Sequence, residues 1–241
     1  MIPISGKTYW LIGASEGLGR ALARTLAAEG AHLVLSARSA DRLESLSADI
    51  PGSRVLAMDV TDAESVRGAI AEVGDIDGVI YNAGAYDPMN ASDWDADAAL
   101  TMCDVNFMGA MRILGQIIPT FLNAGKGDVT LIGSLAAYRG LPNSIGYGAS
   151  KAALRSLAET MRHDLAGSGI VVRLVNPGFI DTRLTRKNTF KMPMLMSPEK
   201  AAAKVARAMR KRRFRTDFPA PFSWILRLYS LLPDFLALGF K

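Results

Sequence analysis

The stretch TYWLIGASEGLG, residues 8–19, decides the fold of this chain. Residues 8–12 are mostly apolar and predict a buried strand, and the glycines that follow predict a tight turn that opens a helix over 18–29. Such a turn lets the backbone approach a pyrophosphate, and the helix directs its free N–H groups and positive dipole end at that anion. We therefore interpret the turn as a phosphate-binding loop whose members are Gly13, Ser15, Glu16, Gly17, Leu18 and Gly19.

Other motifs overlap this turn. Its GxxxGxG spacing differs from the GxGxxG dinucleotide fingerprint. The assignment as a phosphate-binding loop therefore rests mainly on the position of the turn, directly after the first strand and at the start of a helix. Residues 13–17 also match the GxSxG nucleophile elbow of hydrolases, but only twelve residues precede Gly13, and the elbow needs an oxyanion donor from an earlier strand's loop. Gly6-Lys7-Thr8 resembles the end of a P-loop, although its upstream glycine would fall on Met1.

Working outward from this turn, short apolar runs alternate with helical stretches along the chain. Strands are predicted at 32–37, 54–58, 78–81, 128–132 and 170–175, and helices at 41–48, 62–73, 96–122, 144–165 and 201–209. This alternation predicts an α/β fold with a doubly wound parallel sheet of the Rossmann type, in three α/β/α layers. We expect one domain over residues 1–218, with the irregular stretch 183–197 as a lid.

Composition limits the classes of protein that fit. The 241 residues are 49% hydrophobic and 21% charged, which favours a large buried core over disorder. The single cysteine, Cys103, cannot form an internal disulfide, and no signal peptide or membrane-spanning run is evident, so we expect a cytoplasmic protein. The two histidines, His32 and His163, have no partners at metal-ligand spacing, and we expect no metal.

Basic charge is concentrated at the C-terminus. Residues 200–241 hold ten Lys or Arg against two acids, whereas residues 1–199 hold 18 against 21. A nucleic-acid binder would more often spread a basic face over the folded domain, so no nucleic-acid partner is expected. The apolar tail, residues 219–241, has Phe222, Ile225, Leu226, Tyr229 and Leu232 at helical spacing. This stripe fits packing on the body or on a second subunit, and a peripheral membrane contact is the alternative.

The end of the second predicted strand indicates which nicotinamide cofactor is bound. A carboxylate there would hold a ribose 2′-hydroxyl, but the sequence has Arg38, which suits a 2′-phosphate. After the third strand, Asp59 and the adjacent Val60 are candidates for contact with the adenine. Glu16 carries a negative charge in the turn and opposes 2′-phosphate binding. NADP(H) is therefore favoured, with NAD(H) as the alternative.

A tyrosine and a lysine are placed to move a proton. Tyr147 and Lys151 are four residues apart, so on a helix they share a face. A phenol with a pKa near 10 is a poor acid–base catalyst at neutral pH, and a neighbouring ammonium would lower that pKa. The pair predicts proton transfer by Tyr147.

With the other motifs, this chain resembles the short-chain dehydrogenase/reductase family, in its compact single-domain branch, over residues 5–210. The glycine-rich turn, Asn82-Ala83-Gly84, Ser134, Tyr147 with Lys151, and Pro177-Gly178 occur in the family's order. The resemblance implies that Tyr147 exchanges a proton with the substrate oxygen, that Ser134 orients this oxygen, and that Asn106 holds a water linking Lys151 to solvent. It implies a cofactor floor and nicotinamide neighbourhood formed by Asn82, Ala83, Gly84, Tyr147, Lys151, Pro177, Gly178, Ile180 and Thr182.

The resemblance also implies an activity and an assembly. We expect an oxidoreductase that transfers hydride between NADP(H) and a small-molecule carbonyl or secondary alcohol, hydrophobic in view of the methionines within 183–197. Family members commonly pair through their two long helices, so a homodimer or homotetramer is expected. A non-enzymatic nucleotide sensor and a membrane-surface protein on the same fold remain the alternatives.

Overall fold

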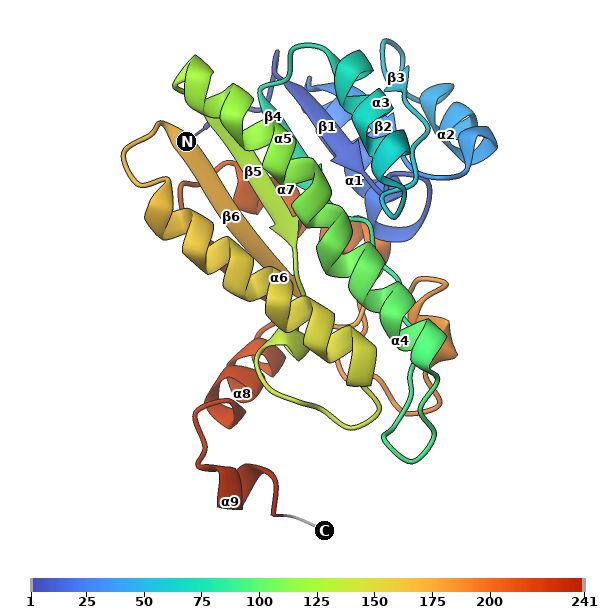
Figure 1. The fold of residues 1–241 in the computed structure, drawn as a ribbon, viewed down its shortest axis with the longest axis vertical. Coiled ribbons are helices and arrows are strands. Elements are labelled where there is room, and N and C mark those ends of the chain that lie inside the picture. The colour runs from blue at the N-terminus through green and yellow to red at the C-terminus, as the bar shows by residue number, and fades with distance from the viewer. Residues whose placement is uncertain (1, 240–241) are drawn as a thin grey trace.

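The computed structural model of the chain describes residues 2–239, so Met1 and the last two residues of the predicted tail, Phe240 and Lys241, lie outside the described residues. A sheet of seven parallel strands runs through the molecule in the order β3-β2-β1-β4-β5-β6-β7 (Figure 1). The order reverses between β1 and β4, which creates a crevice at the carboxyl ends of the central strands.

The strands and the helices alternate along the chain. The strands are β1 (Thr8–Ile12), β2 (His32–Ser36), β3 (Arg54–Val55), β4 (Gly78–Tyr81), β5 (Gly127–Ile132), β6 (Ile170–Pro177) and β7 (Arg215–Phe218). The α-helices are α1 (Gly17–Ala28), α2 (Ala40–Ser47), α3 (Ala63–Val73), α4 (Ala96–Cys103), α5 (Gly109–Ala124), α6 (Ile145–Asp164), α7 (Pro198–Met209), α8 (Phe222–Tyr229) and α9 (Asp234–Ala237). Short helical turns lie at η1 (Asp104–Met108), η2 (Leu135–Ala137) and η3 (Thr185–Lys187).

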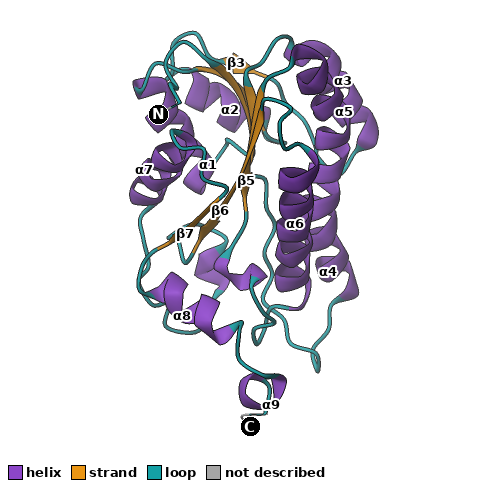
Figure 2. Ribbon diagram, turned by 90° about the vertical axis from the view of Figure 1, so that its left-hand side faces the viewer, coloured by secondary structure: helices purple, strands orange, loops and turns teal. Residues whose placement is uncertain are grey.

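Helices cover both faces of the sheet (Figure 2). Helices α1, α2 and α7 lie on one face, and α3, α4, α5 and α6 lie on the other. Strand β1 shows why both faces are covered: Tyr9 and Leu11 belong to the core beneath α1 and α7, whereas Trp10 and Ile12 belong to the core beneath α5 and α6. All four side chains are buried, as expected for a parallel sheet. The predicted three-layer, doubly wound architecture is confirmed.

The predicted elements differ most from the structure in two places, and the other bounds differ by at most three residues. The strand predicted at 54–58 is regular only over Arg54–Val55, and beyond it the N–H groups of Leu56 and Met58 donate singly to Leu35 and Ala37. The helix predicted at 96–122 is divided by the π-helical turn Asp104–Met108. A π turn accommodates one extra residue, and a hydrophobicity pattern does not reveal it.

The continuous helical run Ala96–Ala124 is the one described helix long and apolar enough to cross a membrane, with a mean hydropathy of 1.2 over its best window. In the structure this run belongs to the body, because α4 contacts α6 and α5 contacts α3. Arg112 pairs with Asp104 within the run, with Nη1 and Oδ1 2.7 Å apart. A core helix of a globular domain passes the same length and hydropathy test.

The tail forms two short helices at the end of the molecule where the β5–β7 strands terminate (Figures 1 and 2). Pro221 and Pro233 immediately precede α8 and α9, as their positions in the sequence indicate. The predicted single apolar stripe is only partly right. Phe222 and Leu226 face the body, but Ile225 is 60% exposed.

Candidate active site

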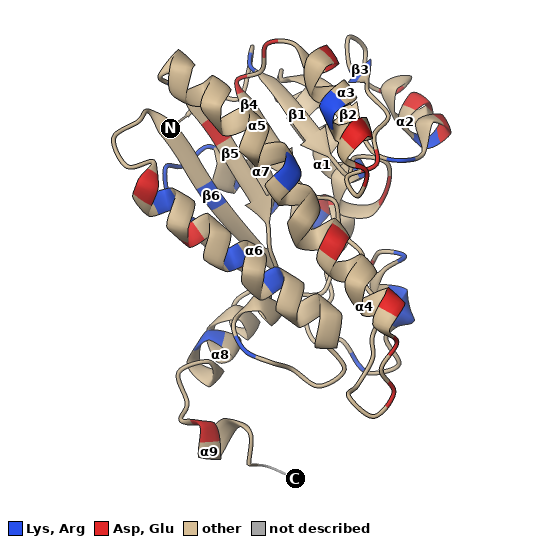
Figure 3. Cartoon of the chain, in the orientation of Figure 1, with Lys and Arg blue, Asp and Glu red and all other residues tan. Residues whose placement is uncertain are grey.

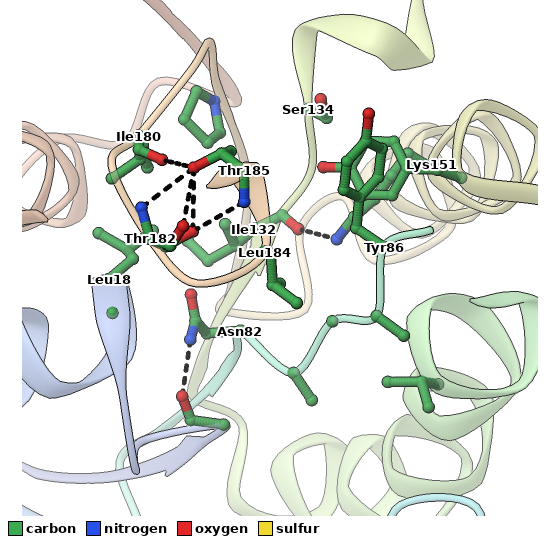
Figure 4. Close-up of a pocket in the computed structure, with 18 of the residues that line it drawn as sticks. Leu18, Asn82, Tyr86, Ile132, Ser134, Lys151, Ile180, Thr182, Leu184 and Thr185 are labelled. Atoms are coloured by element: carbon green, nitrogen blue, oxygen red, sulfur yellow. Dashed lines mark hydrogen bonds between the residues drawn. The ribbon is translucent and has the colours of Figure 1, made fainter. Parts of the chain in front are cut away.

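A cavity of about 420 Å³ lies at the carboxyl ends of the strands. Its walls come from the glycine-rich turn, the segments after β2 to β5, the first turns of α6, the stretch after β6, and α8. Figure 4 shows residues from the start of α1, from β5 and the segments after β4 and β5, from α6 and from the stretch after β6. The structure brings most of the predicted site residues to this cavity: Gly13, Ser15, Glu16, Gly17, Leu18, Arg38, Asp59, Val60, Asn82, Ala83, Gly84, Ser134, Tyr147, Lys151, Pro177, Gly178, Ile180 and Thr182. Gly19 and Asn106 do not line it.

The glycine-rich turn is compact because its glycines admit close backbone contacts. A Cβ on Gly13, whose φ is +85°, would meet the Ala83 nitrogen at 2.6 Å, and one on Gly19 would meet the Gly13 oxygen at 1.9 Å. The Asn82 Nδ2 atom donates to that same oxygen at 2.8 Å, which joins the turn to the end of β4. Helix α1 begins at Gly17 and no side chain caps it, so its first N–H groups face the cavity. These residues fit a dinucleotide pyrophosphate.

One end of the cavity collects arginines around a single carboxylate. Arg38, Arg42 and Arg183 all line the wall near Glu16. Arg183 donates to both Glu16 oxygens, at 3.1 and 2.7 Å, and Arg42 approaches at 3.3 Å. The hydrogen bonds from Arg183 hold the pKa of Glu16 below its usual range. Three guanidinium groups against one carboxylate leave this end positive, which fits a phosphate.

The Asp59 carboxylate accepts hydrogen bonds from a residue close to it in the sequence. Its Oδ1 atom accepts from the Thr61 N–H at 2.9 Å and from the Thr61 hydroxyl at 2.8 Å. Asp62, not Thr61, caps helix α3 by accepting from the Glu64 N–H. Asp59 still lines the cavity, so its expected contact with adenine remains a prediction.

Ser134, Tyr147 and Lys151 converge at the other end of the cavity. Ser134 follows β5, is 8% exposed, and accepts from the Ala136 N–H at 3.1 Å at the start of η2. Tyr147 and Lys151 lie one turn apart on α6, with the Lys151 Nζ atom 5.9 Å from the centre of the tyrosine ring. That Nζ atom donates to the Ile132 carbonyl at 3.0 Å (Figure 4). The Tyr86 ring packs edge-on against Tyr147, with ring centres 4.9 Å apart.

Burial dominates the ionisation of the tyrosine–lysine pair. It raises the pKa of Tyr147, and a hydrogen bond from Ser134 opposes this rise. Burial also lowers the pKa of Lys151 to about 8. The sequence argument expected the ammonium to lower the tyrosine pKa, but the net shift is upward because both groups are removed from water without a carboxylate nearby. At neutral pH an amine with this pKa is still mostly protonated, and an anion bound at this site would favour its charged form further.

Asn106 lies behind the cavity, fully buried in the π turn η1. Its Oδ1 atom accepts from the Ala85 N–H at 2.7 Å, and its Nδ2 atom donates to the Ala85 carbonyl at 3.0 Å and the Ser150 hydroxyl at 2.9 Å. The side chain therefore fixes the segment after β4 against α6. The expected proton-relay role of Asn106 remains a prediction.

The apolar wall of the cavity differs from the expected methionine lid. Met192, Met194 and Met196 do not line the cavity, and Met194 and Met196 border a shallow surface depression instead. The wall is formed by Phe179, Leu184, Phe190, Phe222 and Leu226. Tyr86 also lines it, whereas Tyr138 does not and donates to Asp217 at 2.7 Å.

Sequence reasoning did not single out Arg42, Phe222 or Leu226 as parts of the site. Arg42 lies four residues beyond Arg38 in the sequence, a spacing that could have indicated a second basic group at the same wall. Phe222 and Leu226 are four residues apart in the predicted tail helix, so their shared face was visible in the sequence. The sequence did not show that this face points into the cavity, because that depends on how the tail packs against the rest of the domain.

Comparison with known proteins identifies the class of molecule. A family model described as short chain dehydrogenase matches residues 7–192. The chain is 32% identical over 242 residues to an uncharacterised oxidoreductase of Myxococcus xanthus, with 97% of this chain and 96% of the relative covered. It is 34% identical over 189 residues to a sulfoacetaldehyde reductase of Chromohalobacter salexigens, with 75% of each chain covered.

Solved structures agree with this comparison. A short chain dehydrogenase from Burkholderia cenocepacia, crystallised in complex with NADP, aligns with a TM-score of 0.87 at 27% identity and covers 99% of this chain and 98% of its own. The molecule is thus an oxidoreductase that acts on CH–OH/C=O groups. The chain belongs to the short-chain dehydrogenase/reductase family, and the resemblance that the sequence motifs indicated is confirmed.

Proposed function

We propose that the chain is an NADP(H)-dependent reductase or dehydrogenase of an apolar carbonyl or secondary alcohol, with Tyr147 as the acid–base group. The observation that carries this proposal is the convergence of Ser134, Tyr147 and Lys151 at one end of the cavity, opposite the glycine-rich turn. A non-enzymatic nucleotide sensor would have no use for a buried phenol beside a buried amine.

The preference for NADP(H) rests on the arginine-rich end of the cavity. Arg38 approaches it from the segment between β2 and α2, and Arg42 approaches it from the first turn of α2. The described residues at the end of β2 place no carboxylate there to hold a ribose 2′-hydroxyl. Arginine suits a phosphate because its planar fork can donate two hydrogen bonds at once. The NADP in the Burkholderia cenocepacia relative supports this preference.

The residues of the chain bind the substrate oxygen and move one proton. NADPH, when bound, supplies the hydride. Ser134 donates to the substrate oxygen and fixes it beside the Tyr147 hydroxyl, which transfers its proton to that oxygen during reduction. Lys151, held by the Ile132 carbonyl, lies close enough to stabilise the resulting phenolate when it is protonated. Tyr86 covers one edge of Tyr147 and keeps water from the ring.

The substrate end of the cavity selects for apolar molecules. Phe179 stacks on Phe222 with ring centres 5.7 Å apart, and Phe190 meets Phe179 edge-on at 5.8 Å. Together with Leu184 and Leu226, these rings form an apolar wall in the cavity that also holds the Ser134 and Tyr147 hydroxyls. A ketone or alcohol with an extended hydrocarbon or aromatic body fits this wall.

Two measurements test the proposed function. NADPH and NADH titrations monitored by nucleotide fluorescence should show tighter NADPH binding, and Arg38→Ala should lose NADPH affinity by roughly 10- to 100-fold while NADH affinity stays constant. A screen of apolar ketones should then find NADPH oxidation that Tyr147→Phe reduces by roughly 100-fold or more at unchanged nucleotide affinity. Nucleotide binding without turnover on any ketone or alcohol would favour the sensor.

We also propose a homodimer or homotetramer assembled through the long helices, and a division of the chain into a domain of residues 1–218 and a tail. Leu100, Met108, Met111 and Leu122 are 42–66% exposed on the helical run 96–124, which supports burial against a second subunit. Light scattering on the purified protein tests the assembly, and a monomeric mass would exclude it.

A further inference from the structure

Helix α8 is apolar on two sides. Phe222 and Leu226 line the cavity, and Ser223 is fully buried between them. On the other side, Trp224, Ile225 and Leu228 are 64%, 60% and 66% exposed. A surface helix normally has one apolar face, turned to the core. The same helix here forms a wall of the site and presents large apolar side chains to the surroundings.

The exposed side continues beyond α8. Leu231, Phe235 and Leu238 are 79%, 75% and 65% exposed. We call these six side chains the tail face: Trp224, Ile225, Leu228, Leu231, Phe235 and Leu238. Helices α8 and α9, which hold four of them, project from one end of the molecule (Figures 1 and 2). A soluble protein rarely exposes so much apolar surface together unless the surface binds something.

The tail is fixed to the body, so the tail face is held outward. Arg139, in the segment after η2, donates to the Leu232 carbonyl at 2.6 Å and to the Asp234 carboxylate at 2.5 Å. The Tyr229 hydroxyl donates to the Ala237 carbonyl at 2.9 Å, which ties α9 back to α8. These bonds orient both helices while the apolar side chains remain exposed.

The charged groups around the tail face carry a small net positive charge. Residues 219–239, which the structure describes completely, hold one base, Arg227, and one acid, Asp234, and Arg139 from the body pairs with Asp234. Helix α8 carries basic but no acidic colouring in Figure 3. Its one arginine, Arg227, stays 42% exposed, although its Nη1 atom lies 3.7 Å from the buried carboxylate of Asp217. Exposed tryptophan, phenylalanine and leucine beside arginine are the composition of a helix that lies in the interface of an anionic bilayer.

We infer that the tail face binds the surface of an anionic lipid bilayer. Trp224, Leu228 and Phe235 enter the boundary between headgroups and acyl chains, and Arg227 contacts the headgroups. A projecting face suits a fluid layer, which closes around each side chain, whereas a protein partner would need a hollow of matching shape. Bilayer contact would satisfy the exposed side chains without any change in the body.

The position of α8 gives this contact a consequence for the site. Because Phe222 and Leu226 face the cavity from the helix that carries Trp224 and Leu228, the bilayer would lie against the outer side of the cavity wall. If the proposed function holds, the substrate is a lipophilic carbonyl or alcohol that exchanges with the bilayer beside α8.

Vesicle co-sedimentation of the full-length protein tests the inference without cofactor or substrate, so its result does not depend on the proposed function. The protein should sediment with phosphatidylcholine–phosphatidylserine vesicles and much less with phosphatidylcholine alone. The double variant Trp224→Glu, Leu228→Glu should reduce binding by on the order of tenfold or more. The matched variant Trp94→Glu, at a tryptophan that is 59% exposed in the segment before α4, outside both the tail face and the proposed subunit contact, should bind vesicles like the wild type.

Three outcomes would overturn the inference. Wild-type protein could stay in the supernatant with both vesicle types, or the double variant could sediment like the wild type. Alternatively, light scattering without lipid could show that the double variant alone has half the wild-type mass, which would assign the tail face to a second copy of the chain. Thermal unfolding and NADPH titration of the variants confirm that each remains folded, because all three substituted side chains are exposed.

Discussion

Arg183 holds Glu16 with two atoms of its guanidinium group, Nε at 3.1 Å from one carboxylate oxygen and Nη2 at 2.7 Å from the other. The two residues are 167 positions apart in the sequence. The contact joins the irregular stretch after β6 to the phosphate-binding turn across the mouth of the cavity. A carboxylate thus occupies arginine donors that a 2′-phosphate would also attract.

The first prediction concerns this carboxylate. Glu16→Gln removes a negative charge from the wall formed by Arg38 and Arg42, so NADPH should bind roughly three- to tenfold more tightly while NADH affinity stays within twofold. Fluorescence titration of both nucleotides measures this. Asp49→Asn is the matched control, because Asp49 also pairs with arginines but lies outside the cavity wall. Weaker NADPH binding in Glu16→Gln would mean that the Arg183 contact is needed to close the site.

The second prediction concerns the glycine-rich turn. Gly19→Ala would place a Cβ 1.9 Å from the Gly13 oxygen, so the turn must distort, and affinity for both nucleotides should fall by at least about tenfold. Gly68→Ala is the control, because a Cβ there meets nothing within 4 Å on helix α3 and should stabilise the fold by about 0.5–1 kcal/mol. Titration and thermal unfolding check the pair. Unchanged nucleotide affinity in Gly19→Ala would exclude the turn as the phosphate site.

The third prediction concerns the buried amine. Because burial lowers the pKa of Lys151 to about 8, the folded chain releases this proton more easily than the unfolded chain, whose lysines titrate near 10.4. Wild-type stability relative to Lys151→Met should therefore rise as the pH increases from 8 toward 10.4, and fall again as the pH decreases to 8. The shift corresponds to about 3 kcal/mol. Urea unfolding of both proteins at pH 7.5 and pH 10 measures it, and a constant difference would contradict it.

The fourth prediction concerns the bond that anchors the segment after Ser134. Tyr138→Phe removes the donor to Asp217, whose side chain is only 6% exposed, and leaves that carboxylate oxygen without this partner. The free energy of unfolding should fall by about 1–3 kcal/mol. Tyr86→Phe should cost less, because Asn188, which accepts from Tyr86, is half-buried and water can replace the lost bond. Equal losses of unfolding free energy in the two variants would show that the Tyr138–Asp217 bond stabilises the fold no more than the Tyr86–Asn188 bond.

The sequence predicted the parts of the structure that depend on local pattern. The apolar run 8–12, the glycines after it and the Tyr147–Lys151 spacing each act through neighbouring residues, so their strand, turn and shared helix face follow from the order of residues alone. The parallel sheet with helices on both faces followed from the alternation of strands and helices. These features were therefore predictable.

Other features depend on contacts between distant residues. Nothing near Glu16 in the sequence indicates that Arg183 will bind it, and Tyr138 gives no sign of its bond to Asp217. The upward shift of the Tyr147 pKa reflects burial, which the sequence does not measure. Ile225 was assigned to the packed stripe because helical spacing groups residues by face, but the stripe does not say how far the body extends over it.

The π turn Asp104–Met108 acts as a one-residue insertion within an otherwise continuous helix. Each residue of an α-helix rotates the chain by about 100°, so the extra residue sets the rotation of α5 relative to α4. Deleting any one residue of the turn would restore a regular helix, but it would also turn the face of α5 away from α3 or move Asn106 away from Ala85 and Ser150. The number of residues in this helical run is therefore constrained more tightly than their identity. Single-residue deletions in this helix should be tolerated far less than substitutions at its exposed positions.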